Sequence, residues 1–92
     1  MAIPTYKKLC NPILIVLHQK GGSSRLDELE RAVADLIGLS ASERNEKRSD
    51  GKSRLHHRIA WARFYLKKKG LLARVRPGMC ALSDKGKRIR SI

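Results

Sequence analysis

Basic side chains crowd one stretch of this 92-residue chain, residues 53–72, with the sequence SRLHHRIAWARFYLKKKGLL. Six of them interleave with apolar residues, at Arg54, Arg58, Arg63, Lys67, Lys68 and Lys69. The apolar residues recur at the period of an α-helix, at Leu55, Ile59, Ala62 and Leu66. A helix that buries this stripe turns its cations toward solvent, where they can neutralise the phosphates of a nucleic acid. A plain solvated face has the same pattern, so the rest of the chain must decide between the two interpretations.

The charge of the chain is concentrated in its second half. Residues 1–46 contain six Lys or Arg and six Asp or Glu, whereas residues 47–92 contain fifteen and two, so the second half carries the whole net charge of +13. A neutral half joined to a strongly basic half indicates one face dedicated to a polyanion. Nucleic acid fits better than a membrane surface, which calls for a broad apolar face with interfacial aromatic residues. With one Trp, one Phe and two Tyr, the chain is poor in such residues, which also disfavours a stacking platform for single strands.

Residue types that catalyse reactions are present, but their spacing is unsuited to catalysis. Asp50-Gly51-Lys52 has the acid-x-lysine letters of a metal-dependent nuclease, yet it lies in a polar turn without an apolar strand around it. His56 and His57 are adjacent, so on a helix they point about 100 degrees apart and cannot chelate one metal ion from a shared face. No Ser-His-Asp set or glycine-rich phosphate loop accompanies them. The sequence therefore predicts no enzymatic activity, no catalytic residue, no metal site and no cofactor.

Cysteine usage and hydropathy indicate a reducing compartment. Cys10 and Cys80 are isolated thiols without a Cys-x-x-Cys spacing, and we expect both to be small core residues. The apolar run at residues 13–17 is too short for the core of a secretion signal, and no apolar run is long enough to span a bilayer. The location that these features predict is the cytoplasm, in association with the nucleoid.

The N-terminal half predicts two helices and a short strand. Residues 1–20 have a helical pattern whose expected buried residues are Leu9, Cys10, Ile13, Leu14, Val16 and Leu17. Pro12 interrupts this pattern, and it either kinks one helix or separates a short entry turn from a main helix. An Asn-Pro pair suits the start of a helix, so we expect the second arrangement, with the main helix starting near Asn11. Residues 23–25 are expected to form a short edge strand, with Ser24 as the cap of a second helix over residues 26–37. The buried residues expected on that helix are Leu29, Val33, Leu36 and Ile37.

Polar signals then lead into the basic stretch. Ser40 and Glu43 have the spacing of a capping box, which favours one or two helical turns within residues 39–46. Asp50-Gly51 marks the turn of a polar loop, and Ser53 is a suitable cap for the basic helix.

The remainder of the chain predicts a β-hairpin. Gly70 supplies the left-handed residue that ends a helix. Residues 71–75 and 79–83 are expected to pair as strands around a turn at residues 77–78, followed by a basic tail or frayed helix. This order of elements predicts a mainly α fold with a small β-hairpin, the winged helix-turn-helix, as a single domain over residues 1–92.

An ordered set of short motifs covers nearly the entire chain: Ile3-Pro4-Thr5-Tyr6, Gly38-Leu39-Ser40 with Glu43-Arg44, Asp50-Gly51, Arg58 with Trp61-Ala62, Leu66 through Gly70-Leu71-Leu72, Gly78, and Leu82-Ser83 with Lys85-Gly86. In this order and at these spacings, the motifs resemble the N-terminal winged-helix domain of Mrr-type restriction proteins. The resemblance implies a DNA-binding module that sits in front of a nuclease domain and helps to recognise foreign or modified DNA. The partners implied are double-stranded DNA and a nuclease domain in cis or in trans.

Three departures from the family pattern fall on the presumed contact surface. His57 stands where an Asn commonly precedes the Arg of the basic helix, Lys69 where an Ala precedes the Gly, and Pro77 where the wing tip is commonly basic. Because these positions touch that surface, the family's target preference is not carried over to this chain.

The hypothesis for function is binding of double-stranded DNA by a recognition helix, about residues 53–69, and a basic wing, about residues 71–82. The chain would act as the target-recognition module of a restriction-type nuclease or as a stand-alone relative of such modules. A recognition helix enters the major groove with its N-terminal half nearest the base edges. The residues expected there are Lys52, Ser53, Arg54, His56, His57 and Ala60. The residues expected to contact the DNA backbone are Arg63, Lys67 and Lys68 on the helix, and Arg74 and Arg76 on the wing, which also reach toward the minor groove.

Three aromatic residues of the basic stretch receive separate predictions. Trp61 is expected to pack at the edge of the core, although an exposed indole could stack on a base step. Phe64 is expected to face outward, where it could touch a thymine methyl group or a partner protein, and Tyr65 is expected at the margin of the core.

Two alternatives of other classes stay open at the level of sequence. Small basic proteins also bind RNA or ribosomes without sequence preference, and equal affinity for an A-form duplex would indicate that function. A winged helix can also serve as a protein-interaction or homodimerisation module, in which case the basic half meets an acidic partner.

Overall fold

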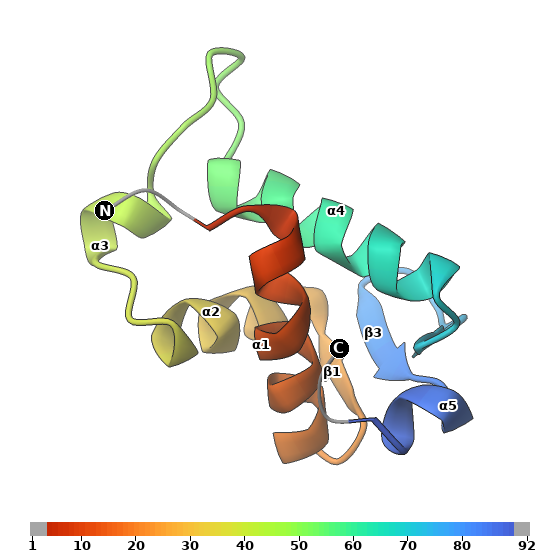
Figure 1. The fold of residues 1–92 in the computed structure, drawn as a ribbon. Coiled ribbons are helices and arrows are strands. Elements are labelled where there is room, and N and C mark those ends of the chain that lie inside the picture. Colours follow the sequence, from red (N-terminus) through yellow and green to blue (C-terminus); the bar gives the residue numbers. More distant parts are fainter. Residues whose placement is uncertain (1–3, 90–92) are drawn as a thin grey trace.

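The computed structural model describes residues 4–89 of the chain (Figure 1). In chain order the elements are α1 (Tyr6–Gln19), β1 (Ser23–Arg25), α2 (Leu26–Leu36), α3 (Ala41–Arg44), α4 (Arg54–Lys68), β2 (Leu72–Ala73), β3 (Met79–Leu82) and α5 (Asp84–Lys87). Helix α1 packs against α2, α4 and the sheet, so it forms the centre of the domain. The fold is the mainly helical winged helix-turn-helix that the order of sequence signals predicts, in which α2 and α4 are the two long helices of the helix-turn-helix and α1 packs against both.

Aliphatic side chains from α1 and α4 fill most of the core. The predicted buried face of α1 is confirmed, at Leu9, Cys10, Ile13, Leu14, Val16 and Leu17. The predicted stripe of α4 is confirmed as well, at Leu55, Ile59, Ala62 and Leu66. Because both helices present these stripes to each other, the opposite side of α4 is left to solvent.

Pro12 lies inside α1, so the expectation of a separate main helix starting near Asn11 is wrong. Proline has no backbone N–H, and the helix therefore lacks the bond that residue 12 would donate to the carbonyl of Lys8. Buried residues such as Leu9 and Ile13 lie on both sides of the proline, and their packing holds the helix continuous. Of the predicted first helix, residues 1–3 lie outside the described part of the chain.

The sheet has three antiparallel strands in the order β1-β3-β2. Residues 23–25 form the predicted edge strand, in which Ser24 is paired with Cys80, while Leu72 is paired with Leu82 across β2 and β3. Strand β2 is shorter than the predicted 71–75. Its chain leaves the ladder after Ala73, and Gly78 turns back at a φ of 84°, as the Pro-Gly signal predicts.

Helix α2 differs from the sequence predictions at both ends. The N-cap of α2 is Arg25 and not Ser24. Ser24 is buried, and its hydroxyl donates a hydrogen bond to the Arg25 carbonyl at 2.9 Å. At the other end Leu36 is 45% exposed, although the apolar period predicts it buried, and Ile37 is half-buried beyond the helix. The period assigns Leu36 to the inner face, but the packing within residues 4–89 leaves its side chain exposed at the end of the helix.

Both ends of α4 have the predicted capping residues. The Ser53 hydroxyl accepts a hydrogen bond from the His56 amide at 3.2 Å. At the C-terminal end Gly70 has a φ of 76°, and its amide donates to the Lys67 carbonyl while the Leu71 amide donates to that of Leu66. These paired bonds form a Schellman motif, which directs the chain from α4 straight into the wing.

The C-terminal segment is ordered as α5 where the sequence predicts a basic tail or frayed helix. Ser83 caps this helical turn, and Gly86 packs so closely on the wing that an added Cβ would lie 2.0 Å from the Leu71 carbonyl oxygen. The carbonyl of Ile89 accepts a hydrogen bond from Nε2 of His18 on α1 at 2.8 Å, which ties this segment to the first helix. Residues 90–92 of the predicted tail lie outside the described range.

Candidate nucleic-acid interface

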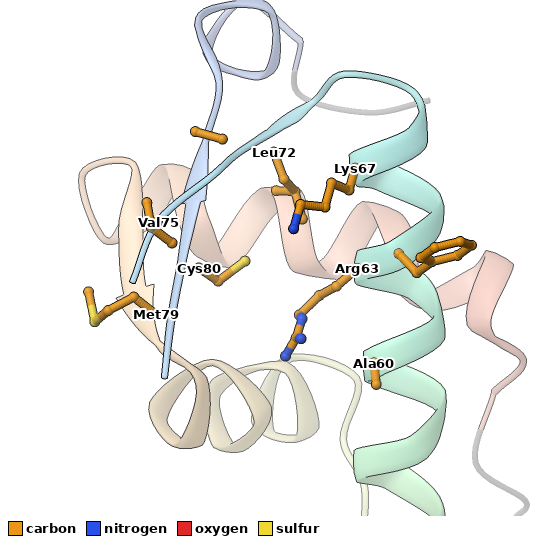
Figure 2. Close-up of a pocket in the computed structure, with 9 residues that line it drawn as sticks. Ala60, Arg63, Lys67, Leu72, Val75, Met79 and Cys80 are labelled. Carbon is orange, nitrogen blue, oxygen red and sulfur yellow. The ribbon is translucent and has the colours of Figure 1, made fainter. Parts of the chain in front are cut away.

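A groove of about 290 Å³ lies between α4 and the wing, and two of the predicted DNA-contacting cations, Arg63 and Lys67, line it (Figure 2). Its lining residues are Ala60, Arg63, Phe64, Lys67, Leu72, Ala73, Val75, Met79 and Cys80. In Figure 2 the side chains of Arg63 and Lys67 extend from α4 toward the sheet. They lie one helical turn apart on one flank of α4, so they can hold two successive anionic groups. Three of the predicted DNA-contacting residues, Ala60, Arg63 and Lys67, are therefore brought together here.

The two cysteines occupy the buried positions that the sequence predicts. Cys80 lies at the wall of the groove, where burial raises the pKa of its thiol, and the positive charges of Arg63 and Lys67 partly oppose this shift. Burial also raises the pKa of Cys10, which is completely inaccessible. Both thiols are therefore protonated at neutral pH, which makes them weak nucleophiles.

A second basic element, the 47–53 hairpin, precedes α4 and extends away from the helices (Figure 1). Residues Lys47 and Ser53 form its bridge, and the Arg48 amide donates to the Lys52 carbonyl at 2.8 Å. Its turn has Gly51 at a φ of 84°, as predicted from Asp50-Gly51. The hairpin holds the exposed side chains of Lys47 and Lys52 beside the N-terminal end of α4.

Several predicted base-contacting residues already have protein partners. Arg54 forms an ion pair with Glu46 at 2.9 Å, and His56 contacts the Glu30 carboxylate of α2. The Ser53 hydroxyl is occupied as the helix cap. Contact of these side chains with DNA therefore requires that they exchange an existing partner, whereas Lys52 is exposed and available.

His57 lies between two groups that can only donate hydrogen bonds. Nη1 of Arg48 lies 2.9 Å from its Nδ1, and Nε1 of Trp61 lies 3.0 Å from its Nε2. A neutral imidazole has one acceptor nitrogen, so His57 accepts from Arg48 or from Trp61, but not from both at once. The donor that is released is free for another acceptor, such as a phosphate oxygen or a base edge.

The wing contributes exposed cations at its tip. Arg74 and Arg76 are both exposed in the loop between β2 and β3, and the Leu26 amide of α2 donates to the Gly78 carbonyl at 2.9 Å. This bond fixes the tip of the wing against the start of α2. The predicted wing cations are not among the residues that line the groove with Arg63 and Lys67, although their chain neighbours Ala73 and Val75 are.

Trp61 is 49% exposed, so the prediction that it packs at the edge of the core is wrong. Phe64 is 52% exposed, as predicted, and Tyr65 lies at the core margin, as predicted. Lys68 places its ammonium 5.4 Å from the centre of the Phe64 ring, a cation–π contact that keeps this predicted phosphate ligand on the outer face of α4. Tyr6 on α1 contacts Trp61, and the sequence does not predict this contact because nothing local signals a contact between residues so far apart.

Within residues 4–89, no group of three or more His, Cys, Asp or Glu side chains could hold a metal ion. In the same range, no helix has the length and apolar character needed to cross a membrane.

Comparison with known proteins places these features in a family. The family model for the Mrr N-terminal domain matches residues 6–91. Over 86 residues the chain is 31% identical to a type IV methyl-directed restriction enzyme, EcoKMrr, of Escherichia coli strain K12. The alignment covers 94% of this chain but 28% of that relative, and no solved structure matches. The chain therefore belongs to the Mrr N-terminal domain family.

Proposed function

We propose that the chain binds double-stranded DNA through α4 and the wing, as the target-recognition module of a restriction-type nuclease. The observation that carries the proposal is the groove in which Arg63 and Lys67 lie opposite the wing, within the half of the chain that holds the whole net charge of +13. A duplex backbone that follows this groove would meet cations of α4, of the wing and of the 47–53 hairpin. These cations would neutralise its phosphates and fix the position of the domain on the duplex.

The two halves of α4 are assigned different contacts with DNA. Its N-terminal half presents His57 and Ala60 toward base edges, and the adjoining 47–53 hairpin adds Lys52. Ser53, Arg54 and His56 belong to the same end of the helix and reach DNA by exchanging their present partners. Its C-terminal half presents Arg63, Lys67 and Lys68 to phosphates, and Arg74 and Arg76 extend the contact along the wing. Helix α4 enters the major groove, because that groove admits an α-helix.

The relative from Escherichia coli is named a methyl-directed restriction enzyme, which supports DNA as the partner. The nuclease that completes the function acts in cis or in trans, and this chain supplies recognition rather than catalysis. Location in the cytoplasm at the nucleoid follows from DNA as the partner. Homodimerisation belongs to the proposal as well, because two copies would recognise two half-sites about one helical turn apart.

The test is a fluorescence-anisotropy titration of the chain with short duplex DNA across a range of salt concentrations. If about six phosphates are contacted, the logarithm of the affinity falls with the logarithm of salt at a slope of roughly −5. Arg63→Gln combined with Lys67→Gln should make that slope shallower by about 2 and weaken binding roughly 30-fold near 0.15 M salt. Lys20→Gln combined with Arg31→Gln removes the same charge from exposed positions outside the groove and serves as the matched control.

Other outcomes identify the rival functions. Equal affinity for an RNA duplex would favour a nonspecific RNA-binding protein. A stable dimer that binds no duplex even at the lowest salt would favour a protein-interaction module instead. Equal losses in the groove variant and the control would show that general charge, and not the groove, attracts the DNA.

A further inference from the structure

Three side chains form a connected polar cluster on the outer side of α4, the Arg48–His57–Trp61 cluster. Arg48 belongs to the 47–53 hairpin, and its Nη1 lies 2.9 Å from Nδ1 of His57. Trp61 lies one helical turn further along α4, and its Nε1 lies 3.0 Å from Nε2 of the same imidazole. The cluster therefore joins the hairpin to the N-terminal half of α4, the half with which a recognition helix reads bases (Figure 1).

The cluster contains more hydrogen-bond donors than acceptors. A guanidinium and an indole can only donate, and a neutral imidazole has one acceptor nitrogen. In one tautomer Nδ1 of His57 accepts from Arg48, and the Nε2–H then faces the indole N–H of Trp61. In the other tautomer Nε2 accepts from Trp61, and the Nδ1–H then faces the guanidinium of Arg48. Two donors face each other in either tautomer, so one of them needs an acceptor that the cluster does not contain.

The other partner of Arg48 within residues 4–89 holds it only weakly. Nη1 of Arg48 lies 3.8 Å from the Asp50 carboxylate, and the two side chains are 36% and 44% exposed. An ion pair this long and this exposed contributes little free energy. Asp50 is also engaged in the turn of the hairpin, where its Oδ1 accepts from the Lys52 amide at 3.0 Å. Little free energy therefore opposes the release of Arg48 toward an acceptor on another molecule.

The arrangement of the donors restricts which acceptor fits. When His57 accepts from Trp61, its Nδ1–H and the guanidinium of Arg48 are neighbouring donors, and they suit two neighbouring acceptors. Guanine alone among the four bases shows two acceptors and no donor on its major-groove edge, at O6 and N7. Adenine shows one acceptor beside a donor, cytosine shows a donor, and thymine shows a single acceptor. A phosphate also carries neighbouring acceptor oxygens, so a test must separate a base from the backbone.

We infer that Arg48 and His57 read a guanine, by donating one hydrogen bond each to its two major-groove acceptors, O6 and N7. This inference rests on the proposed function, because it requires the N-terminal half of α4 to enter the major groove. It adds Arg48 to the residues that contact bases, and it gives the contact of His57 a base preference. Trp61 is a positioning residue, because its indole N–H selects the tautomer of His57 that presents Nδ1–H to the base.

The test removes one acceptor atom from a guanine and leaves its base pair intact. Duplexes with a randomised central segment are first selected by binding to the wild-type chain, and the enriched sequences should share a guanine at one position. Replacement of that guanine by 7-deazaguanine exchanges N7 for a C–H group, so binding should weaken about fivefold to tenfold. Inosine at the same position loses only the minor-groove amino group, and it should bind nearly as tightly as guanine.

Substitutions separate the guanine contact from general affinity. Arg48→Ala should reduce the ratio of affinities for the guanine and 7-deazaguanine duplexes to about twofold or less, because one donor of the pair is lost. Lys47→Ala is the matched control, since it removes the same charge from an exposed position of the same hairpin. It should weaken both duplexes equally and leave their ratio unchanged. Trp61→Phe keeps an aromatic ring but loses the indole N–H, so it should lower the ratio about twofold without changing the salt dependence.

The tautomer of His57 provides an independent measurement. Heteronuclear NMR of the imidazole nitrogens distinguishes a proton on Nδ1 from a proton on Nε2. The guanine duplex should shift His57 toward the form with the proton on Nδ1, and the 7-deazaguanine duplex should shift it less. A proton on Nε2 in the complex with the guanine duplex would overturn the inference.

The remaining outcomes distinguish this inference from the proposed function. If the wild-type chain binds DNA steeply with salt but tolerates 7-deazaguanine at every position, the guanine contact is refuted and DNA binding stands. If no duplex binds at any salt concentration, the proposed function fails and the inference with it. If Arg48→Ala weakens all duplexes alike and the ratio persists, Arg48 contacts a phosphate, and the inference is overturned.

Discussion

Helices α2 and α4 are the two main helices of the same motif, yet they carry opposite charge. Helix α2 has four acids and one arginine, whereas α4 has five cations and no acid. Their N-terminal ends are also stabilised differently. Helix α2 has no side-chain cap but places Asp27 and Glu28 in its first turn, while α4 is capped by the Ser53 hydroxyl and has no acid there.

The difference bears on the stability of each helix and on the function proposed for α4. Acids at the start of a helix interact favourably with its dipole, so the charges of α2 stabilise α2 itself. The cations of α4 repel one another, and those near its N-terminal end, Arg54 with Lys52 and Arg48 of the 47–53 hairpin, oppose the dipole. Their placement lowers the stability of the isolated helix, and a polyanionic partner would remove that penalty.

The largest expected effect concerns how α4 is held in place. Ile59 is completely buried beneath α4, whereas Leu36 at the end of α2 is 45% exposed. Ile59→Ala should lower the free energy of unfolding by about 2–5 kcal/mol, because it leaves a cavity in the core. Leu36→Ala should change it by no more than about 0.5 kcal/mol. Urea unfolding measures both, and similar losses would show that packing does not distinguish the two helices.

A smaller effect is expected at the N-terminal cap of α4. Ser53→Ala removes the acceptor of the His56 amide and should lower the free energy of unfolding by about 1 kcal/mol. Ser24→Ala, before α2, is a control at a hydroxyl that does not cap its helix. Ser53→Asp restores an acceptor and adds a favourable charge, so it should recover the stability while weakening DNA binding. Loss of stability in Ser53→Asp would show that the cap is not what Ser53 contributes.

The acidic residues at the start of α2 should contribute less to the free energy of unfolding than the cap of α4 does. Asp27→Asn and Glu28→Gln should each lower the free energy of unfolding by about 0.3–1 kcal/mol at low ionic strength, because both carboxylates meet the positive end of the helix dipole. Lys52→Gln beside α4 should leave the stability unchanged or raise it slightly. Thermal unfolding at low and high salt measures these differences, which should shrink as salt increases. A destabilising Lys52→Gln would refute the view that the cations of α4 oppose its folding.

Patterns that depend on one element were readable from the sequence. The buried stripes of α1 and α4, the caps at Ser40 and Ser53, and the helix end at Gly70 are all set by spacing within a few residues, and all are confirmed. The capping box at Ser40 is complete, and the hydrogen bond from the Ser40 backbone amide lowers the pKa of Glu43.

Features that depend on a distant neighbour were not readable. Pro12 stays within α1 because packing on both sides of it outweighs one lost hydrogen bond. The exposure of Leu36 depends on how the other elements pack at the end of α2 within residues 4–89, which a local period does not encode. Trp61 is exposed on the outer side of α4, and its contact with Tyr6 joins residues of two helices that are far apart in the sequence. The candidate DNA-contacting residues were identifiable from their charge, but the protein groups with which they form ion pairs and hydrogen bonds were not. The contact between His56 and Glu30 joins residues that are 26 positions apart.

That contact yields the smallest and most specific prediction, an increase in DNA affinity. Glu30 of α2 holds His56 of α4 and brings a negative charge to the edge of the proposed interface. Glu30→Gln should release His56 and raise the affinity for duplex DNA about twofold to fivefold at low salt, with little gain at high salt, because the removed repulsion is screened. Glu28→Gln changes the net charge equally from an exposed position on the same helix, and it should raise the affinity less. If both variants gain the same affinity for DNA, only the net charge matters. If Glu30→Gln binds DNA more weakly than the wild-type chain, the carboxylate positions His56 for DNA, and α2 takes a direct part in recognition.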